Sequence, residues 1–309
     1  MSNKIIFVPF SYSSVKRSGN NMRHRNNPFD DYCKVFCVAL VSIKEKNQNC
    51  DVALVTDTDI PLYYKTILER NDILILNAGF DSFVFPDQYP WCLAFYKLCA
   101  LKFIVENYKY DYVCYVDADV IANNPFDPIW KECDYNILLY DINHGRQVPN
   151  YRVFLEELST FLGEDTNATQ YGGEFFAANI NNAKIFISSC LDVYNKLIEK
   201  KFITTKGDEF ILTISAHQNK LLIKNAGAYI YRFWTGCFRL VSTNYKANPV
   251  CVLHLPDEKT GGIIKIFNKY IRKDKLPTAN KIYSLCHLTH IKFLLSIKQH
   301  IHKILKYKS

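Results

Sequence analysis

The sequence predicts an α/β fold with a mostly parallel sheet flanked by helices. Up to residue 120, short apolar runs alternate with longer segments whose apolar residues recur at helical spacing. Strands that alternate with helices form parallel sheets covered on both faces. The apolar fraction of 49 % over 309 residues is typical of a globular chain with a sizeable core.

The first part of the chain gives the clearest elements. Residues 4–10 are predicted to form a buried strand. Residues 28–46 are predicted to form a helix, because Asn27-Pro28 combines an N-cap residue with a proline suited to the first helical position. Further strands are expected at 51–56, 72–76 and 111–116, with helices at 60–70 and 91–107. Ligands of such sheets bind at the carboxyl ends of the strands, near residues 10–12, 56–59, 77 and 117–119.

The second part of the chain mixes strands and helices without an internal repeat. Strands are expected at 135–140, 174–180 and near 219–223, 227–231 and 250–254, with helices at 151–162, 183–200 and 208–217. Since no low-complexity linker divides the chain, we expect one α/β domain over residues 1–262 and a helical basic appendage over residues 263–309.

The charge of the chain is uneven. The whole chain has 38 Lys and Arg against 30 Asp and Glu, yet residues 263–309 contain eleven of the basic residues and a single acidic one, Asp274. The remainder is slightly acidic, so a protein that coats nucleic acid through general positive charge is excluded.

Residues 286–308 can place apolar side chains on one helical face and most basic side chains elsewhere. This pattern is typical of a helix that lies on an anionic membrane surface. It also fits a helix docked on the core through its apolar stripe. RNA binding is the weakest alternative, because no pattern of stacking aromatics accompanies the charge.

The compartment is expected to be the cytosol, with the protein peripheral on the cytosolic face of a membrane. The eleven cysteines include no CxxC pair, which argues against a zinc ribbon or a thioredoxin-type site, and most lie in apolar runs, as buried cysteines of a reducing compartment do. The apolar N-terminal stretch is too short for the core of a signal peptide, and no window is long enough for a membrane span.

A pair of carboxylates, Asp117 and Asp119, follows directly after the predicted strand at residues 111–116. Two neighbouring carboxylates repel each other, and a hard divalent cation such as Mg²⁺ or Mn²⁺ relieves that repulsion while bridging to substrate phosphates. The alternative is a turn that contains two Asp residues by chance.

Residues 95–130 resemble the nucleotide-sugar-dependent glycosyltransferases of GT-A fold, most closely the branch with glycogenin, galactinol synthase and bacterial lipopolysaccharide galactosyltransferases. The shared features are a helix with a basic residue, an apolar strand that ends in Asp-x-Asp, and an Asn-Pro turn, here Lys97, Asp117, Asp119 and Asn124-Pro125. The resemblance implies that Asp119 ligates a metal, that Asp117 contacts the metal or the nucleotide ribose, and that Lys97 neutralises phosphate or sugar oxygens. Lys97 could instead lie on a solvated helix face.

Two downstream segments extend the resemblance. The YGGEFFAAN segment at Tyr171–Asn179 is similar to the small-residue segment against which blood-group-type enzymes hold donor and acceptor. Glu174 departs from that pattern, and we expect it to contact the nucleotide sugar. Asp208-Glu209 is similar to a segment beneath the donor sugar, with Glu209 near the reaction centre and Asp208 on a sugar. A plain strand with a tight turn, and acidic residues that favour a helix N-terminus, are the structural alternatives.

The remaining candidate residues lie at or just after the ends of predicted strands. By resemblance, His254 at the end of an apolar strand would be a third metal ligand, and Lys259 would contact the diphosphate, although it comes five residues later instead of six. The alternative for His254 is a histidine that only makes structural hydrogen bonds. Phe10, Ser11, Tyr12 and Asp57 follow the first two strands, where this family binds base and ribose.

The expected function is a metal-dependent hexosyltransferase that moves a sugar from a nucleoside-diphosphate sugar, UDP-linked, to a glycan or glycolipid with retention. The cofactor would be Mn²⁺ or Mg²⁺, and no nucleic-acid partner is expected. A sugar nucleotidyltransferase and a catalytically inactive glycan-binding module remain as alternatives. The absence of a P-loop and of GxGxxG removes kinase-like and dinucleotide-binding enzymes.

Overall fold

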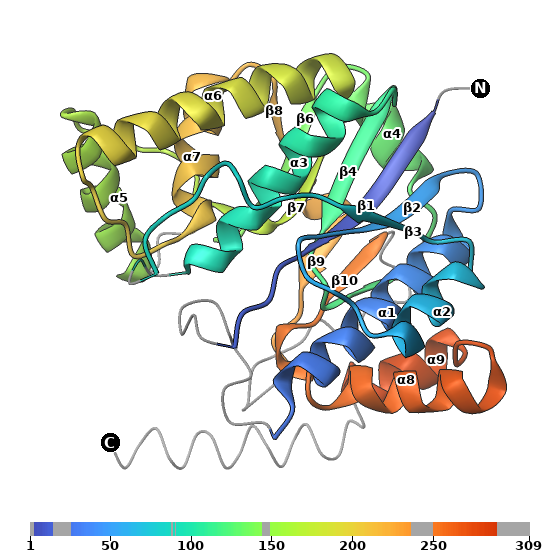
Figure 1. Cartoon of the computed structure of the whole chain (residues 1–309). Helices are drawn as coiled ribbons and strands as arrows, with labels where there is room; N and C mark the ends of the chain where they lie inside the picture. The colour runs from blue at the N-terminus through green and yellow to red at the C-terminus, as the bar shows by residue number, and fades with distance from the viewer. Residues whose placement is uncertain are drawn as a thin grey trace, which may run out of the picture.

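A seven-stranded sheet forms the centre of the molecule, in the order β3-β2-β1-β4-β7-β6-β8 (Figure 1). The computed structural model describes residues 3–14, 26–87, 89, 91–143, 149–235 and 250–288. The strands are β1 (Lys4–Phe10), β2 (Asp51–Thr56), β3 (Leu74–Asn77), β4 (Tyr112–Val116), β6 (Ile137–Asp141), β7 (Tyr171–Asn179) and β8 (Ile223–Asn225). Only β7 runs antiparallel to its neighbours in this sheet. The predicted mostly parallel sheet is confirmed.

A second sheet of three short strands is formed by β5 (Val120–Ala122), β10 (Val252–His254) and β9 (Ile230–Arg232), in that order. β10 pairs antiparallel with β5 and parallel with β9. In this register His254 lies opposite Val120, the residue after Asp119. The small sheet therefore brings the C-terminal part of the chain to the end of β4.

Helices cover both faces of the central sheet (Figure 1). One face is covered by α1 (Pro28–Lys46), α2 (Leu62–Glu69) and α4 (Asp127–Cys133), and on the same side α8 (Gly262–Lys273) packs against α1 and α9 (Ala279–Leu285) packs against α8. The other is covered by α3 (Tyr96–Asn107), α5 (Pro149–Leu162), α6 (Ile180–Glu199) and α7 (Asp208–Gln218). Short 3₁₀ turns lie at Cys92–Phe95, Ala226–Ala228 and Pro256–Glu258. Successive residues of β1 enter opposite cores, since side chains alternate along a strand.

The helix α1 begins and ends where its sequence predicts. The Asn27 side chain accepts a hydrogen bond from the backbone of Asp30, and Pro28 occupies the first turn. Ser42 accepts a hydrogen bond from the backbone of Ala122, which ties α1 to the small sheet. The helix thereby joins the two sheets.

The observed elements differ from the prediction in a few places. β5 and α4 were not expected, because three and seven residues are too few for a clear periodic pattern. The predicted helix at residues 91–107 divides into a 3₁₀ turn and α3, and it follows Trp91, which has a φ of 60°. β3 begins two residues later than expected because Asp72, with a φ of 55°, is still part of the turn after α2.

The first part of the predicted appendage packs against the main body. Ile263, Ile266, Phe267 and Tyr270 of α8 are buried in the same core as α1. The Tyr270 hydroxyl accepts a hydrogen bond of 2.8 Å from the Asn71 side chain. Residues 286–288 form a turn after α9, and the rest of the amphipathic helix predicted for 286–308 lies outside the described residues. The division of the chain at residue 263 stays a prediction.

None of the helices in the described part of the chain combines the length and the apolar character that a membrane crossing requires.

Candidate active site

A cleft of about 490 Å³ opens where β1, β4 and β10 end. Ten of the twelve side chains singled out from the sequence line it, namely Phe10, Ser11, Tyr12, Lys97, Asp117, Asp119, Asp208, Glu209, His254 and Lys259. A larger hollow of about 680 Å³ lies between α1, α2 and α8, but none of the predicted site residues lines it. The cleft at the strand ends is therefore the candidate active site.

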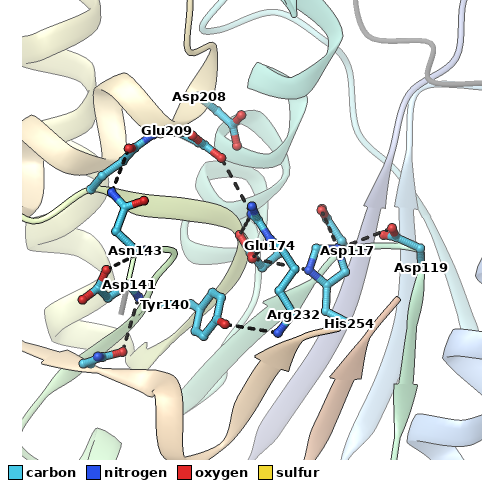
Figure 2. A network of polar contacts seen from close by, with 12 residues as sticks. Asp117, Asp119, Tyr140, Asp141, Asn143, Glu174, Asp208, Glu209, Arg232 and His254 are labelled. Atoms are coloured by element: carbon cyan, nitrogen blue, oxygen red, sulfur yellow. Dashed lines mark hydrogen bonds and ion pairs between the residues drawn. The ribbon is translucent and has the colours of Figure 1, made fainter. Parts of the chain in front are cut away.

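Three potential metal ligands meet at one edge of this cleft. Asp117 and Asp119 follow β4, His254 ends β10, and one ligand atom from each lies within 4.8 Å of the others. The backbone holds them there, because the N–H of Leu255 donates to the carbonyl of Asp119 at 2.9 Å and the N–H of Asp117 donates to the carbonyl of Glu174 at 3.0 Å. Figure 2 shows the three side chains turned toward one another.

The chemistry of these donors fits a divalent cation. Asp119 is 1 % exposed, and its Oδ2, which makes no hydrogen bond of good geometry, lies 3.3 Å from His254 Nε2 and 3.0 Å from Lys259 Nζ. Burial alone would raise the pKa of Asp119, but Lys259 and His254 hold it well below its usual range. Two carboxylates and an imidazole suit Mn²⁺, and the carboxylates suit Mg²⁺.

The charge of His254 reflects the same surroundings. Burial would lower its pKa, but the carboxylates of Asp119 and Glu174 raise it to about 9. The site thus attracts positive charge, which either a proton on His254 or a metal ion can supply.

Lys97 reaches from α3 into the cleft between two carboxylates. Its Nζ lies 2.8 Å from Asp117 Oδ1 and 3.5 Å from Asp208 Oδ2. Burial would lower the pKa of Lys97, but Asp117 and Asp208 hold it well above its usual value, so the amine stays protonated. The structure thus places Lys97 in the cleft and not on a solvated helix face.

The two acidic residues at the start of α7 occupy different environments. Burial raises the pKa of Asp208, although Lys97 opposes this shift. Glu209 accepts a hydrogen bond of 3.0 Å from the Gln170 amide and lies 3.8 Å from Arg232 Nη2. Burial, partly opposed by Arg232, raises the pKa of Glu209 to about 7. Glu209 can therefore change its charge near neutral pH.

Two predicted residues do not line the cleft. Glu174 lies behind the wall, where it pairs with Arg232, so it could act on a substrate only through its neighbours. Asp57 accepts hydrogen bonds from the Ser11 hydroxyl at 3.0 Å and the Thr58 hydroxyl at 2.9 Å, and it borders a neighbouring hollow at the ends of β2 and β3. Through Ser11, Asp57 still contacts the end of the cleft that the sequence predicts to bind the nucleotide.

Sequence reasoning missed some of the cleft residues. Arg232, Trp234 and Trp91 line the cleft, and the Arg232 guanidinium lies 5.9 Å from the centre of the Trp234 ring. Trp91 is 44 % exposed and packs against Gly207. Trp91 precedes a 3₁₀ turn, Arg232 ends the short strand β9 and Trp234 follows it, and single residues in such places carry no periodic signal that could have identified them.

Comparison with known proteins gives a likeness in fold. No family model matches the chain, and no curated protein matches its sequence. The galactosyltransferase LgtC, solved in complex with donor and acceptor sugar analogues, aligns over 91 % of this chain and 99 % of its own, at a TM-score of 0.54 and 15 % identity. An active-site mutant of LgtC aligns over 92 % and 99 %, at a TM-score of 0.53 and 15 % identity.

The apo form of mouse xyloside xylosyltransferase 1 aligns over 82 % of this chain and 96 % of its own, at a TM-score of 0.49 and 10 % identity. At identities this low, the comparisons with LgtC concern the fold. The chain has the GT-A fold of a solved galactosyltransferase, as its sequence predicts.

Proposed function

We propose that this protein is a metal-dependent glycosyltransferase that moves a hexose from a nucleoside-diphosphate sugar, UDP-linked, to a glycan or glycolipid acceptor. The observation that carries the proposal is the cluster of Asp117, Asp119 and His254 at the strand ends. Such an oxygen and nitrogen donor set suits a divalent cation, which can stabilise a diphosphate leaving group. The fold shared with a galactosyltransferase supports the same reaction class.

The residues divide the chemistry between the two halves of the donor. Asp117, Asp119 and His254 would hold Mn²⁺ or Mg²⁺, and the bound cation would offset the negative charge that develops on the leaving diphosphate. Lys97 and Lys259 would donate hydrogen bonds to phosphate oxygens. Phe10, Ser11 and Tyr12 would form the nucleotide end of the cleft.

Glu209 and Asp208 would face the sugar. As the bond from the anomeric carbon to the diphosphate oxygen breaks, the sugar becomes cationic, and an ionised Glu209 would stabilise that charge. The acceptor oxygen then bonds to the anomeric carbon, and its proton passes to a leaving phosphate oxygen. This sequence, with attack on the face that the diphosphate leaves, retains the anomeric configuration.

The basic C-terminal segment suggests where in the cell this reaction takes place. Residues 289–309 contain five lysines and no acidic residue. We propose that this segment binds an anionic membrane surface and keeps the enzyme at the cytosolic face, where a glycolipid acceptor for a surface polysaccharide would lie.

A donor screen tests the proposed reaction. The purified chain is incubated with UDP, GDP, CDP and dTDP sugars and Mn²⁺, and the released nucleoside diphosphate is measured. We expect hydrolysis of one donor class, lost on chelation with EDTA and restored by added Mn²⁺.

A matched pair of variants tests the metal site in the same screen. Asp119→Asn should lower the rate by about 100-fold or more, because it removes a buried ligand. Glu106→Gln, which removes an exposed carboxylate on α3, should not change the rate. Hydrolysis that survives exhaustive chelation would contradict the metal site. Binding of Mn²⁺ without turnover of any donor would favour an inactive binding module.

A further inference from the structure

Glu174 is a buried carboxylate that contacts two residues of the cleft at once. It lies on β7 and is 1 % exposed. Its Oε1 and Oε2 accept hydrogen bonds from Nε and Nη2 of Arg232, each at 2.7 Å. The same Oε1 lies 3.4 Å from Nδ1 of His254. Figure 2 shows Glu174 between these two side chains.

The backbone places Arg232 and His254 side by side. They are register partners in the parallel pair of β9 and β10. The backbone N–H of Arg232 donates to the Tyr140 hydroxyl at 3.1 Å, which holds β9 against the central sheet. Nη2 of Arg232 also lies 3.8 Å from Glu209 Oε1. A single carboxylate therefore connects a metal-ligand candidate with the residue proposed to face the sugar.

The two ring nitrogens of His254 face different partners. Nε2 faces Asp119 and Asp117, whereas Nδ1 makes no hydrogen bond of good geometry and has Glu174 as its nearby carboxylate. A carboxylate at one ring nitrogen favours the proton there and leaves the lone pair of the other nitrogen for a cation. Glu174 therefore faces Nδ1 of His254, and a contact at Nδ1 can fix the orientation of the imidazole ring.

We propose that Glu174 is a positioning residue that orients the ring of His254 toward the metal ion and the guanidinium of Arg232 toward Glu209. This inference rests on the proposed function, because it assumes that His254 binds a metal. Glu174 itself touches no substrate. It links the position of the ion to the position of the sugar.

Mn²⁺ affinity, measured by electron paramagnetic resonance on the full chain, tests the His254 half of the proposal. Titrations are run with Mn²⁺ alone and with Mn²⁺ and UDP. Glu174→Gln keeps the shape of the side chain but removes its charge, and we expect Mn²⁺ to bind about 10- to 100-fold more weakly. Circular dichroism checks that each variant is folded.

A double variant separates positioning from simple charge compensation. If Glu174 only neutralises Arg232, then Glu174→Gln combined with Arg232→Met leaves no unpaired buried charge and should restore Mn²⁺ affinity to that of the wild type. We expect the double variant to stay weak, because His254 still lacks its carboxylate.

Arg232→Lys tests the other half of the proposal. It keeps the charge opposite Glu174 but loses the two-pronged hydrogen bonding that fixes the guanidinium. We expect Mn²⁺ affinity close to that of the wild type, and a fall in kcat for donor hydrolysis of about 10- to 100-fold with little change in KM.

The control variant is Glu132→Gln, which breaks an ion pair with Lys224 at the surface and should change neither Mn²⁺ affinity nor kcat. If wild-type protein binds no Mn²⁺ with or without UDP, the metal site of the proposed function fails and the role of Glu174 fails with it. If wild-type protein binds Mn²⁺ and Glu174→Gln binds it equally well, or the double variant recovers, the positioning role alone is overturned.

Discussion

Asp208 and Glu209 are neighbours in sequence, but their side chains contact different cations. Asp208 lies near Lys97, while Glu209 lies between Gln170 and Arg232. Because Arg232 is already paired in two-pronged fashion with Glu174, it only partly offsets the burial of Glu209. Glu209 is thus a carboxylate whose charge responds to pH in the neutral range.

The pH dependence of activity should report this response. If ionised Glu209 stabilises the cationic sugar, kcat for donor hydrolysis should rise between pH 6 and 8 with an apparent pKa of about 7. Glu209→Gln should lower kcat by about 100-fold and remove this rise. A Glu209→Gln variant with the turnover and the pH profile of the wild type would exclude Glu209 from the reaction.

Stability should change in the opposite direction. The pKa of Glu209 is raised in the folded protein, so the folded state binds more protons than the unfolded state between the unfolded pKa of 4.5 and about 7, and the free energy of unfolding falls as pH rises through that window. Glu209→Gln should be more stable than wild type at pH 8 and should show no such gain at pH 4. The expected gain is at most roughly 2 kcal/mol, less than the full pKa shift implies, because the Glu209 side chain is 22 % exposed and water reduces the cost of its charge. Urea denaturation at the two pH values measures the difference.

At the scale of elements, the start of α7 depends on one glycine. Gly207 precedes Asp208 with a φ of 62° and a ψ of −139°, a conformation that side chains other than glycine rarely adopt. A Cβ there would lie 2.8 Å from Cβ of Trp91, which itself has a φ of 60°. Two unusual backbone positions therefore contact each other at the edge of the cleft.

Gly207→Ala should disturb both the stability and the site. We expect a loss of about 1–3 kcal/mol in the free energy of unfolding, and a lower kcat because Asp208 and Glu209 shift with the helix start. Gly163→Ala is the matched control, because Gly163 has a φ of 80° but nothing lies within 4 Å of a Cβ there. Gly163→Ala should lose stability without losing activity, and equal kcat values for the two variants would contradict the role of the contact with Trp91.

The sequence predicts most of the elements and much of the cleft, because β1 and β4 are apolar runs followed at once by Ser11 and Asp117, and the apolar run of β10 ends on His254. It does not predict the contact between Glu174 and Arg232. The strand expected near residues 227–231 ends before Arg232, whereas β9 (Ile230–Arg232) carries Arg232 to the register position beside His254, where its guanidinium meets Glu174. The position of Lys259 also could not be settled from its spacing, because it comes one residue earlier than in the resembled family. The 3₁₀ turn at Pro256–Glu258 folds the chain back after His254, and the Lys259 amine lies 3.0 Å from Asp119.

The packing of α8 against the main body can be tested by its contribution to the free energy of unfolding. Ile266 is fully buried, so Ile266→Ala should lower the free energy of unfolding by about 2–5 kcal/mol. Ile271→Ala on the exposed side of α8 should change it by less than about 0.5 kcal/mol. Urea denaturation followed by circular dichroism measures both. If α8 belonged to a separate appendage, Ile266→Ala would leave the main unfolding transition unchanged.

At the scale of the whole molecule, we expect the basic C-terminal segment to contribute to membrane binding but not to catalysis. Replacing Lys292, Lys298, Lys303, Lys306 and Lys308 with Gln should abolish flotation with vesicles of phosphatidylglycerol and phosphatidylcholine, because each lysine near such a surface contributes about 1 kcal/mol. Hydrolysis of a soluble donor should not change. The control replaces five exposed lysines of the main body, Lys46, Lys109, Lys131, Lys184 and Lys220. Equal flotation of the two variants would argue against membrane binding through the C-terminal segment.

The antiparallel pairing of β5 with β10 has a consequence for how the protein folds. It joins Asp119 and His254 from opposite halves of the chain, so the candidate metal cluster does not exist until a contact of very long sequence separation has formed. A nascent chain that has emerged only as far as Asp119 carries the Asp-x-Asp pair but no third ligand. If the cluster binds a divalent cation as proposed, that capacity would be acquired late in folding, and the cation would stabilise only chains that have formed the contact between β5 and β10.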